Sequence, residues 1–192
     1  MSLDPSTGLG EPIRLVRDGS LITSPLDTTA PFPRVSKPLL LTNVKNEAGL
    51  SIYGGGTPPI SVADYEGLVG ETFSSTATQA ILQNTNYAAA TLSTANGSDV
   101  ASTQDERPTL EKLGTDQIWR CPTWTFARNW VGNGGNAYVG LYVVGASYPG
   151  NIETTSFCGD VGVVCHQDDI EIVVRTYYLV LAVFVCSRRR CF

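Results

Sequence analysis

One histidine and one glutamate have the residue types of a catalytic base and its orienting acid. His166 is the only histidine among the 192 residues, and it directly follows a short apolar run at residues 163–165. Glu47 occupies a similar position far upstream, in Asn46-Glu47-Ala48-Gly49 after another apolar run. A carboxylate that fixes the tautomer of an imidazole makes it an effective general base near neutral pH. The pair therefore indicates proton-transfer chemistry, although on spacing alone a single histidine is more often an ordinary polar residue.

Two apolar runs are expected to form the strands that position these side chains. Residues 38–43 are continuously apolar between turn-forming residues, which is typical of a parallel strand covered on both faces. Residues 137–144 show the same pattern. Glu47 then lies just past the carboxyl end of the first strand, and His166 follows the second after a loop that contains glycine and cysteine. Functional groups of α/β folds lie at such strand ends.

Helices are predicted between the two strands. Residues 61–93 are rich in Ala, Leu, Thr and Gln with apolar residues at helical spacing, which predicts two or three short helices. Residues 93–107 are small and polar and are expected to form a loop. Residues 115–130 predict one helix, which the glycines at 132–136 end. The succession of strand, helices and strand predicts an α/β fold, and 192 residues suffice for one domain.

Charge and hydropathy exclude several kinds of partner. The formal charge of −5 argues against nucleic acid, because its phosphates select clustered Lys and Arg; the basic cluster at 188–190 is expected to be a solvated tail. The uninterrupted apolar run at 177–186 has ten residues. A membrane-spanning helix needs about 20, so we expect no membrane span. Residues 1–10 lack the apolar core of a signal peptide.

The cysteines favour an oxidising compartment. Cys158 and Cys165 lie close enough in sequence to close a small loop just before His166, and such a bridge would brace the histidine loop. Zinc is a poorer alternative, because the other cysteines lack partners at short paired spacings. Asn96, in Asn96-Gly97-Ser98, is a candidate glycosylation acceptor.

Three carboxylates after His166 raise the question of a metal. Asp168, Asp169 and Glu171 could bind a hard cation through oxygen, but the ligand offsets and turning glycine of a calcium loop are missing. A cap at the start of a helix is the preferred interpretation for Asp168 or Asp169. We therefore expect neither a metal nor a cofactor.

Three stretches of the chain resemble one enzyme family. Residues 35–49, 119–122 and 162–173 are similar to the carboxyl-terminal part of type-B carboxylesterases, in particular the secreted fungal carboxylesterases and lipases. The resemblance runs from about residue 13 to residue 173. It implies a partial α/β-hydrolase fold: the carboxyl-terminal half of a mostly parallel sheet with flanking helices. It also implies that Glu47 is the acid and His166 the base of a serine hydrolase triad, that the complete protein is secreted, and that its substrate is a carboxylic ester or lipid.

The chain departs from this family in two ways. No Gly-x-Ser-x-Gly occurs; the nearest sequences, around Ser51 and Ser147, each lack the closing glycine, so neither can form the turn that exposes a nucleophile. The family's nucleophile and oxyanion-hole glycines are expected amino-terminal to anything present here. Residues 174–192 form an apolar and basic tail unlike the family, so we divide the chain into a partial esterase domain, 1–173, and that tail.

These departures leave more than one function open. The first expectation is a fragment of a serine ester hydrolase that is inactive alone, because it lacks the attacking hydroxyl and the oxyanion donors. The alternative is a non-catalytic, esterase-like protein that acts in binding or adhesion through its surface. A third hypothesis treats the apolar and basic tail as a membrane-associating segment.

Overall fold

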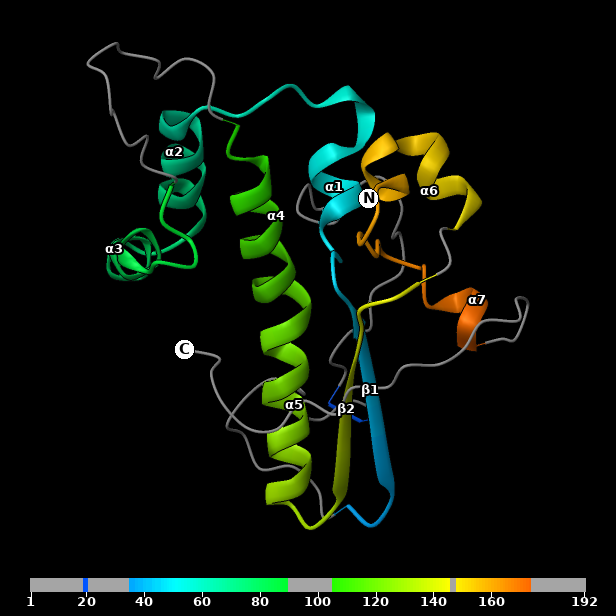
Figure 1. Ribbon diagram of the computed structural model, residues 1–192. Coiled ribbons are helices and arrows are strands. Elements are labelled where there is room, and N and C mark those ends of the chain that lie inside the picture. Colours follow the sequence, from blue (N-terminus) through cyan, green and yellow to red (C-terminus); the bar gives the residue numbers. More distant parts are fainter. Residues whose placement is uncertain (1–18, 21–34, 90–104, 146–147, 174–192) are drawn as a thin grey trace.

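Two parallel strands form one sheet within the described part of the chain. The structure is a computed structural model that describes residues 19–20, 35–89, 105–145 and 148–173. Strand β1 (Pro38–Val44) pairs in parallel with β2 (Asn136–Tyr142), and Leu40 lies opposite Tyr138. The strands predicted at 38–43 and 137–144 are therefore confirmed. The described residues have a mixed α/β architecture with a small parallel sheet (Figure 1).

Three consecutive helical segments form one long helical column that packs against the two strands. Helix α4 (Arg107–Thr115) continues through the π-helical segment η3 (Asp116–Arg120) into α5 (Cys121–Gly132) (Figure 1). The predicted helix at 115–130 is thus correct in type, but the helix begins at Arg107. Pro108 explains the earlier start, because proline is favoured in the first turn, where its missing N–H leaves no hydrogen bond unmade. Pro122 is the second residue after the π-helical segment, and such short π-helical segments occur as bulges inside α-helices.

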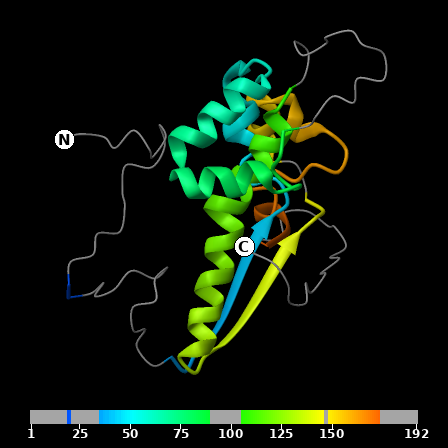
Figure 2. The same ribbon diagram turned by 90° about the vertical axis from the view of Figure 1, so that its left-hand side faces the viewer.

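Two capped helices build a small core against α4. Helices α2 (Val62–Thr72) and α3 (Ser75–Gln83) lie beside the upper part of the helical column (Figure 2). Each begins after a serine whose side chain accepts a hydrogen bond from the backbone of the first turn. Tyr65 and Val69 of α2 are buried together with Leu113 of α4. These two helices confirm the prediction for 61–93 as far as residue 89; residues 90–93, and with them most of the predicted loop at 93–107, lie outside the described residues.

Short helices surround the carboxyl ends of the strands. Helix α1 (Gly49–Tyr53) follows β1 and runs into a 3-10 turn (Gly54–Gly56). After β2 come α6 (Pro149–Thr154), a second 3-10 turn (Ser156–Gly159) and α7 (Ile170–Val173). Figure 1 shows α1 and α6 close together beyond the strand ends. The residues that follow β1 and those that precede α7 are therefore neighbours.

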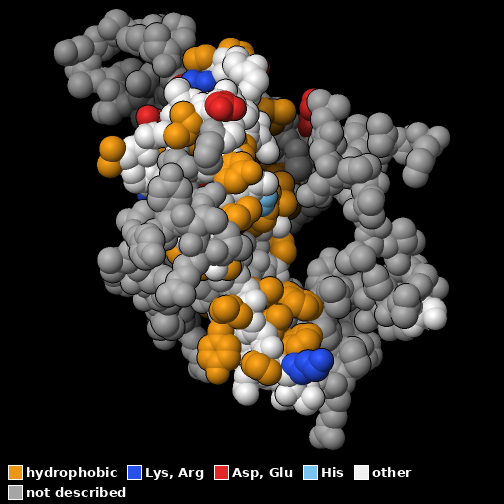
Figure 3. All heavy atoms as spheres, turned by 90° about the vertical axis from the view of Figure 1, so that its right-hand side faces the viewer, with side chains coloured by type: hydrophobic (Ala, Val, Ile, Leu, Met, Phe, Trp, Pro, Cys, Tyr) orange, Lys and Arg blue, Asp and Glu red, His pale blue; other side chains and the backbone are white. Residues whose placement is uncertain are grey.

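Helix α5 packs on one face of the sheet only. The indole Nε1 of Trp130 donates a 2.9 Å hydrogen bond to the carbonyl of Lys37 and ties the end of α5 to the start of β1. Leu40 and its pairing neighbour Tyr138 are 70% and 61% exposed. Apolar side chains gather on the side of the molecule that Figure 3 shows. None of the described helices has the length and hydropathy to cross a lipid bilayer. The tail at 174–192 lies outside the described residues.

Candidate functional site

Glu47 and His166 meet at the carboxyl end of the sheet. Nδ1 of His166 lies 2.6 Å from Oε2 of Glu47, although the two residues are 119 positions apart in the sequence. The Glu47 side chain is 7% exposed and that of His166 46% exposed. A carboxylate at Nδ1 favours the tautomer that carries its proton there, which leaves the basic lone pair on Nε2. The pair can therefore accept and return a proton at an accessible imidazole.

The turn after β1 fixes the carboxylate. Oε1 of Glu47 accepts a 2.8 Å hydrogen bond from the backbone N–H of Val44, the last residue of β1. The N–H of Gly49 donates to the carbonyl of Asn46 and closes the same turn. Each carboxylate oxygen of Glu47 thus has its own partner, one from its strand and one from the imidazole. A short turn between strand and helix therefore holds a buried carboxylate in a single orientation.

The segment before His166 is attached to that turn. The N–H of Asn46 donates to the carbonyl of Val164 at 2.8 Å, and Asn46 forms an isolated parallel bridge with Cys165. The disulfide between Cys158 and Cys165 is present, directly before the histidine. Gln167, directly after it, has φ of 77°, the left-handed region that side-chain-bearing residues rarely adopt. The loop around His166 is therefore constrained on both sides.

The carboxylate of Asp168 holds the loop around His166 through hydrogen bonds. Its carboxylate accepts hydrogen bonds from the N–H of Cys165 at 2.7 Å, from the N–H of Tyr148 at 2.8 Å and from the amide of Asn151 at 2.9 Å. The same amide donates to the carbonyl of His166 at 2.7 Å. The prediction that Asp168 or Asp169 caps the following helix is therefore wrong for Asp168, because its three donors all precede it in the sequence; for Asp169 it stays a prediction.

Two further side chains border the pair. The ring of Trp119, from the π-helical segment, lies 6.0 Å from the imidazole between centroids and is tilted by 47°. Burial raises the pKa of Asp169, and the negative charge of Glu47 acts in the same direction. An aromatic ring and a second carboxyl therefore shape the surroundings of the imidazole.

An open polar depression lies elsewhere on the molecule. It has a volume of about 460 Å³ and is lined in part by Tyr53, Arg107, Phe157 and Asp160; neither Glu47 nor His166 borders it. Burial raises the pKa of Tyr53 to about 12, with Asp105 adding to the effect and Arg107 opposing it. We assign no chemistry to this depression, because Asp105 neutralises its arginine through a 2.7 Å ion pair.

Some predicted features cannot be placed. Asn96 and Ser147 lie outside the described residues, as do the basic cluster at 188–190 and the apolar run at 177–186. Within the described ranges, no three His, Cys, Asp or Glu side chains are arranged to hold a metal ion.

Sequence reasoning missed the side chains that support the pair. Asn46, Asn151, Glu111 and Thr115 are ordinary polar residues in sequence. A signal existed only for Asn46, which directly precedes the candidate acid.

Comparison with protein-family models, curated proteins and solved structures finds no match to this chain.

Proposed function

We propose that this chain supplies the acid and the base of a serine carboxylic ester hydrolase of the type-B carboxylesterase and lipase class. The observation that carries the proposal is the 2.6 Å contact between Glu47 Oε2 and His166 Nδ1. It is supported by the placement of both residues beyond the carboxyl ends of parallel strands, where α/β enzymes hold their functional groups. The resemblance of the sequence around both residues to that family gives the proposal its substrate class, carboxylic esters or lipids, and its secreted location.

The proposed mechanism assigns one proton route to the pair. A serine from a Gly-x-Ser-x-Gly segment, which this sequence lacks, attacks the ester carbonyl carbon while its hydroxyl proton moves to Nε2 of His166. The imidazolium then returns that proton to the departing alcohol, and an acyl-serine forms. Water repeats the sequence, with His166 as base, and releases the acid. Glu47 holds the Nδ1 proton and stabilises the positive charge on the ring throughout.

Two features of the chain limit this activity. The attacking hydroxyl and the oxyanion donors both have to come from additional polypeptide, so we expect the 192-residue chain alone not to hydrolyse esters. In the complete hydrolase, the two-stranded sheet would be one part of a larger parallel sheet of the α/β-hydrolase type.

The test begins with the transcript. It should be sequenced through both ends of this chain, and any longer open reading frame should be expressed and assayed with p-nitrophenyl butyrate. An in-frame Gly-x-Ser-x-Gly upstream and ester hydrolysis that H166A lowers by about 10⁶-fold would support the proposal. E47Q should also lower the rate, and the double variant should lose little more than H166A, because triad members act as a unit. E71Q, at an exposed position of α2, is the control.

One outcome would favour the non-catalytic alternative. A transcript that encodes no upstream nucleophile, together with a product that has no esterase activity, would reject the hydrolase. The exposed apolar face of the sheet, which includes Leu40 and Tyr138, is the observation that favours a binding protein in that case.

A further inference from the structure

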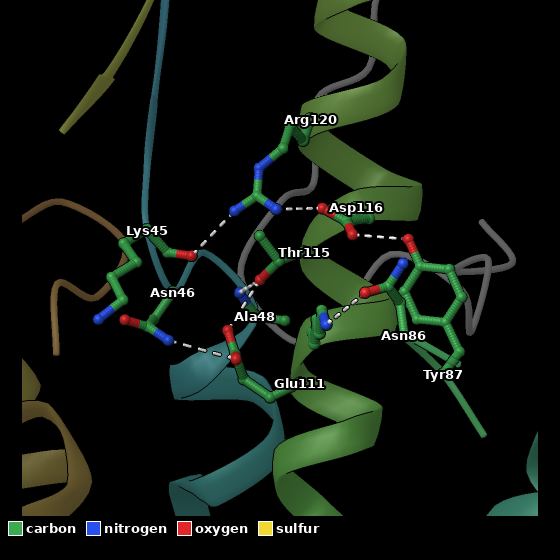
Figure 4. A network of polar contacts seen from close by, with 10 residues as sticks. Lys45, Asn46, Ala48, Asn86, Tyr87, Glu111, Thr115, Asp116 and Arg120 are labelled. Atoms are coloured by element: carbon green, nitrogen blue, oxygen red, sulfur yellow. Dashed lines mark hydrogen bonds and ion pairs between the residues drawn. The ribbon is translucent and has the colours of Figure 1, made fainter. Parts of the chain in front are cut away.

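One face of the long helical column lies against the turn that holds Glu47. Glu111 and Thr115 of α4 and Arg120 of η3 point toward this turn (Figure 4). Their partners on the turn are the residues that flank Glu47. A helix outside the Glu47–His166 pair therefore contacts the backbone that carries the acid.

Glu111 is connected to both neighbours of Glu47. Its Oε2 accepts a 3.3 Å hydrogen bond from the side-chain amide of Asn46. Its Oε1 accepts a 2.8 Å hydrogen bond from the hydroxyl of Thr115, and that hydroxyl in turn accepts a 3.0 Å bond from the N–H of Ala48. The residues directly before and directly after Glu47 are thus attached to one carboxylate.

Asn46 carries this connection on to the histidine segment. Its amide nitrogen donates to Glu111, and its amide oxygen accepts a 3.1 Å hydrogen bond from the N–H of Val164. The backbone of Asn46 also donates to the carbonyl of Val164. Because Val164 lies two residues before His166, the orientation of one amide influences both members of the pair.

The network is buried, so each missing partner in it is costly. Glu111 is 6% and Thr115 1% exposed. A buried polar group without a hydrogen bond loses its hydration without compensation, and linked hydrogen bonds in a medium of low polarity strengthen one another. Arg120 adds a separate link, since its Nη2 donates to the carbonyl of Lys45 at 3.2 Å while Nη1 pairs with Asp116.

We propose that Glu111 is a positioning residue, which sets the contact between Glu47 and His166 through Asn46 and Thr115. This inference rests on the proposed function, since it assigns Glu111 a role in the same site. Glu111 acts only through these two partners and is not itself a catalytic residue. A carboxylate suits this position because it offers one acceptor oxygen to each of the two donors.

The substitution E111Q tests this role with little change in volume. A glutamine has one acceptor oxygen and one amino group. If the amino group faces Asn46, two donors meet; if it faces Thr115, the hydroxyl loses its acceptor and the bond from Ala48 is disturbed. Either arrangement breaks one of the two links to the turn.

The readout is the imidazole itself, which is unambiguous because the chain has a single histidine. The 192-residue chain, expressed without a histidine tag and labelled with ¹⁵N, should show one pair of imidazole nitrogen signals and one proton on Nδ1. The tautomer is read from the nitrogen shifts. The strength of the contact is read from the exchange rate of the Nδ1 proton with water.

We expect E111Q to accelerate this exchange about fivefold, the factor that corresponds to losing one buried hydrogen bond worth about 1 kcal/mol. T115V, which removes the hydroxyl while keeping the shape, should have the same effect, and T115S should restore the wild-type rate. E106Q is the matched control: Glu106 is also a buried glutamate, at the start of α4, but its carboxylate accepts from Thr109. E106Q should leave the imidazole signals unchanged even if it lowers the melting temperature.

The outcomes separate this inference from the proposed function. If E47Q leaves the Nδ1 proton as it is in the wild type, the pair itself is not formed, and the proposed function loses its main support. If E47Q abolishes the signal but E111Q and T115V exchange as slowly as the wild type, Glu111 does not position the pair, while the proposed function stands. If E106Q accelerates exchange as much as E111Q does, the effect is a general loss of stability, and the inference is likewise rejected.

Discussion

Asp168 shows how much one buried carboxylate can organise. It is 1% exposed, and its two oxygens accept from two backbone N–H groups and one side-chain amide. Cys165 closes the disulfide loop, and Tyr148 precedes that loop in the sequence. Because the carboxylate has only acceptors, it suits a position that is surrounded by donors.

We predict that D168N lowers the free energy of unfolding by about 1–3 kcal/mol. The asparagine would place an amino group against either the N–H of Cys165 or the donors from Tyr148 and Asn151, and no rotation of the amide avoids a donor facing a donor. Urea unfolding followed by circular dichroism measures the change. E71Q, an exposed acid-to-amide substitution on α2, should change the value by less than about 0.5 kcal/mol. A D168N variant as stable as the wild type would contradict the hydrogen-bond pattern.

The contributions of Glu111 and Asp105 to stability should change with pH in opposite directions. Burial raises the pKa of Glu111, and the hydrogen bonds from Thr115 and Asn46 oppose that shift. Its contribution to stability is therefore complete below the pKa of the unfolded chain and is lost as the pH rises through its folded-state pKa. The hydrogen bond from Arg107 lowers the pKa of Asp105. That contribution is complete above the unfolded-state pKa and is lost as the pH falls through the folded-state pKa.

The two signs can be measured with one set of variants. Unfolding free energies of the wild type, E111Q and D105N should be determined from neutral to acidic pH. As the pH is lowered, the wild type should gain stability relative to E111Q and lose stability relative to D105N. Parallel curves for the wild type and E111Q would mean that Glu111 is not buried as the structure has it.

At the scale of elements, the pattern of apolar residues predicts the secondary structure better than the positions of proline and glycine do. The strands β1 and β2 are evident in the sequence because parallel strands need apolar residues on both faces. The start of the column α4–η3–α5 is less evident, because Pro108 and Gly114 resemble helix breaks. Pro108 instead lies in the first turn, where proline is favoured, and Gly114 lies inside α4, where tertiary packing overrides its weak helix propensity.

Some residues of the candidate site can likewise be predicted from the sequence and others cannot. Glu47 and His166 are predictable because their residue types and strand-end positions are unusual together. Glu111 and Asn151 are not, because a polar residue on a helix is ordinary until the fold brings a partner within hydrogen-bond distance. Only the three-dimensional structure shows that Asn46 faces Glu111 across 65 positions of sequence.

Two glycines of neighbouring helices should respond to alanine in opposite ways. A Cβ on Gly49, at the start of α1, would lie 2.9 Å from the ring of Phe157 and 3.1 Å from the sulfur of Cys165. Neither atom can move easily, since the ring stacks on Tyr53 at 3.9 Å and the sulfur is in a disulfide. G49A should therefore destabilise the protein by about 1–3 kcal/mol.

Gly67 provides the matched comparison. It lies in the interior of α2, and a Cβ there would meet no atom within 4 Å. G67A should raise the free energy of unfolding by about 0.5–1 kcal/mol, because alanine loses less backbone entropy in a helix. Thermal unfolding of both variants measures the two changes in stability. A G49A variant at least as stable as the wild type would show that the turn that holds Glu47 is less tightly packed than described.

At the scale of the whole molecule, the sheet is the unusual feature. Parallel sheets are normally covered on both faces, because their strands are apolar on both. In the described part of the chain α5 packs on this sheet, and Leu40 and Tyr138, which are paired neighbours, are 70% and 61% exposed. Each described strand also has one edge to which no described strand is paired. Such a surface favours association with further polypeptide.

We therefore predict that the 192-residue chain self-associates with rising concentration and that the double substitution L40K/Y138K shifts it toward monomer. The lysines place two charges where a second copy would otherwise bury apolar surface, and sedimentation velocity measures the change. V161K adds a charge at a fully exposed turn position outside both strands and should leave the association unchanged. If the proposed hydrolase is correct, its longer polypeptide contributes strands that pair with the edges of the sheet and helices that cover this face, so the longer protein should be monomeric without any substitution. Equal self-association of both polypeptides would instead mean that the face is a genuine interface, which is the behaviour expected of a binding protein.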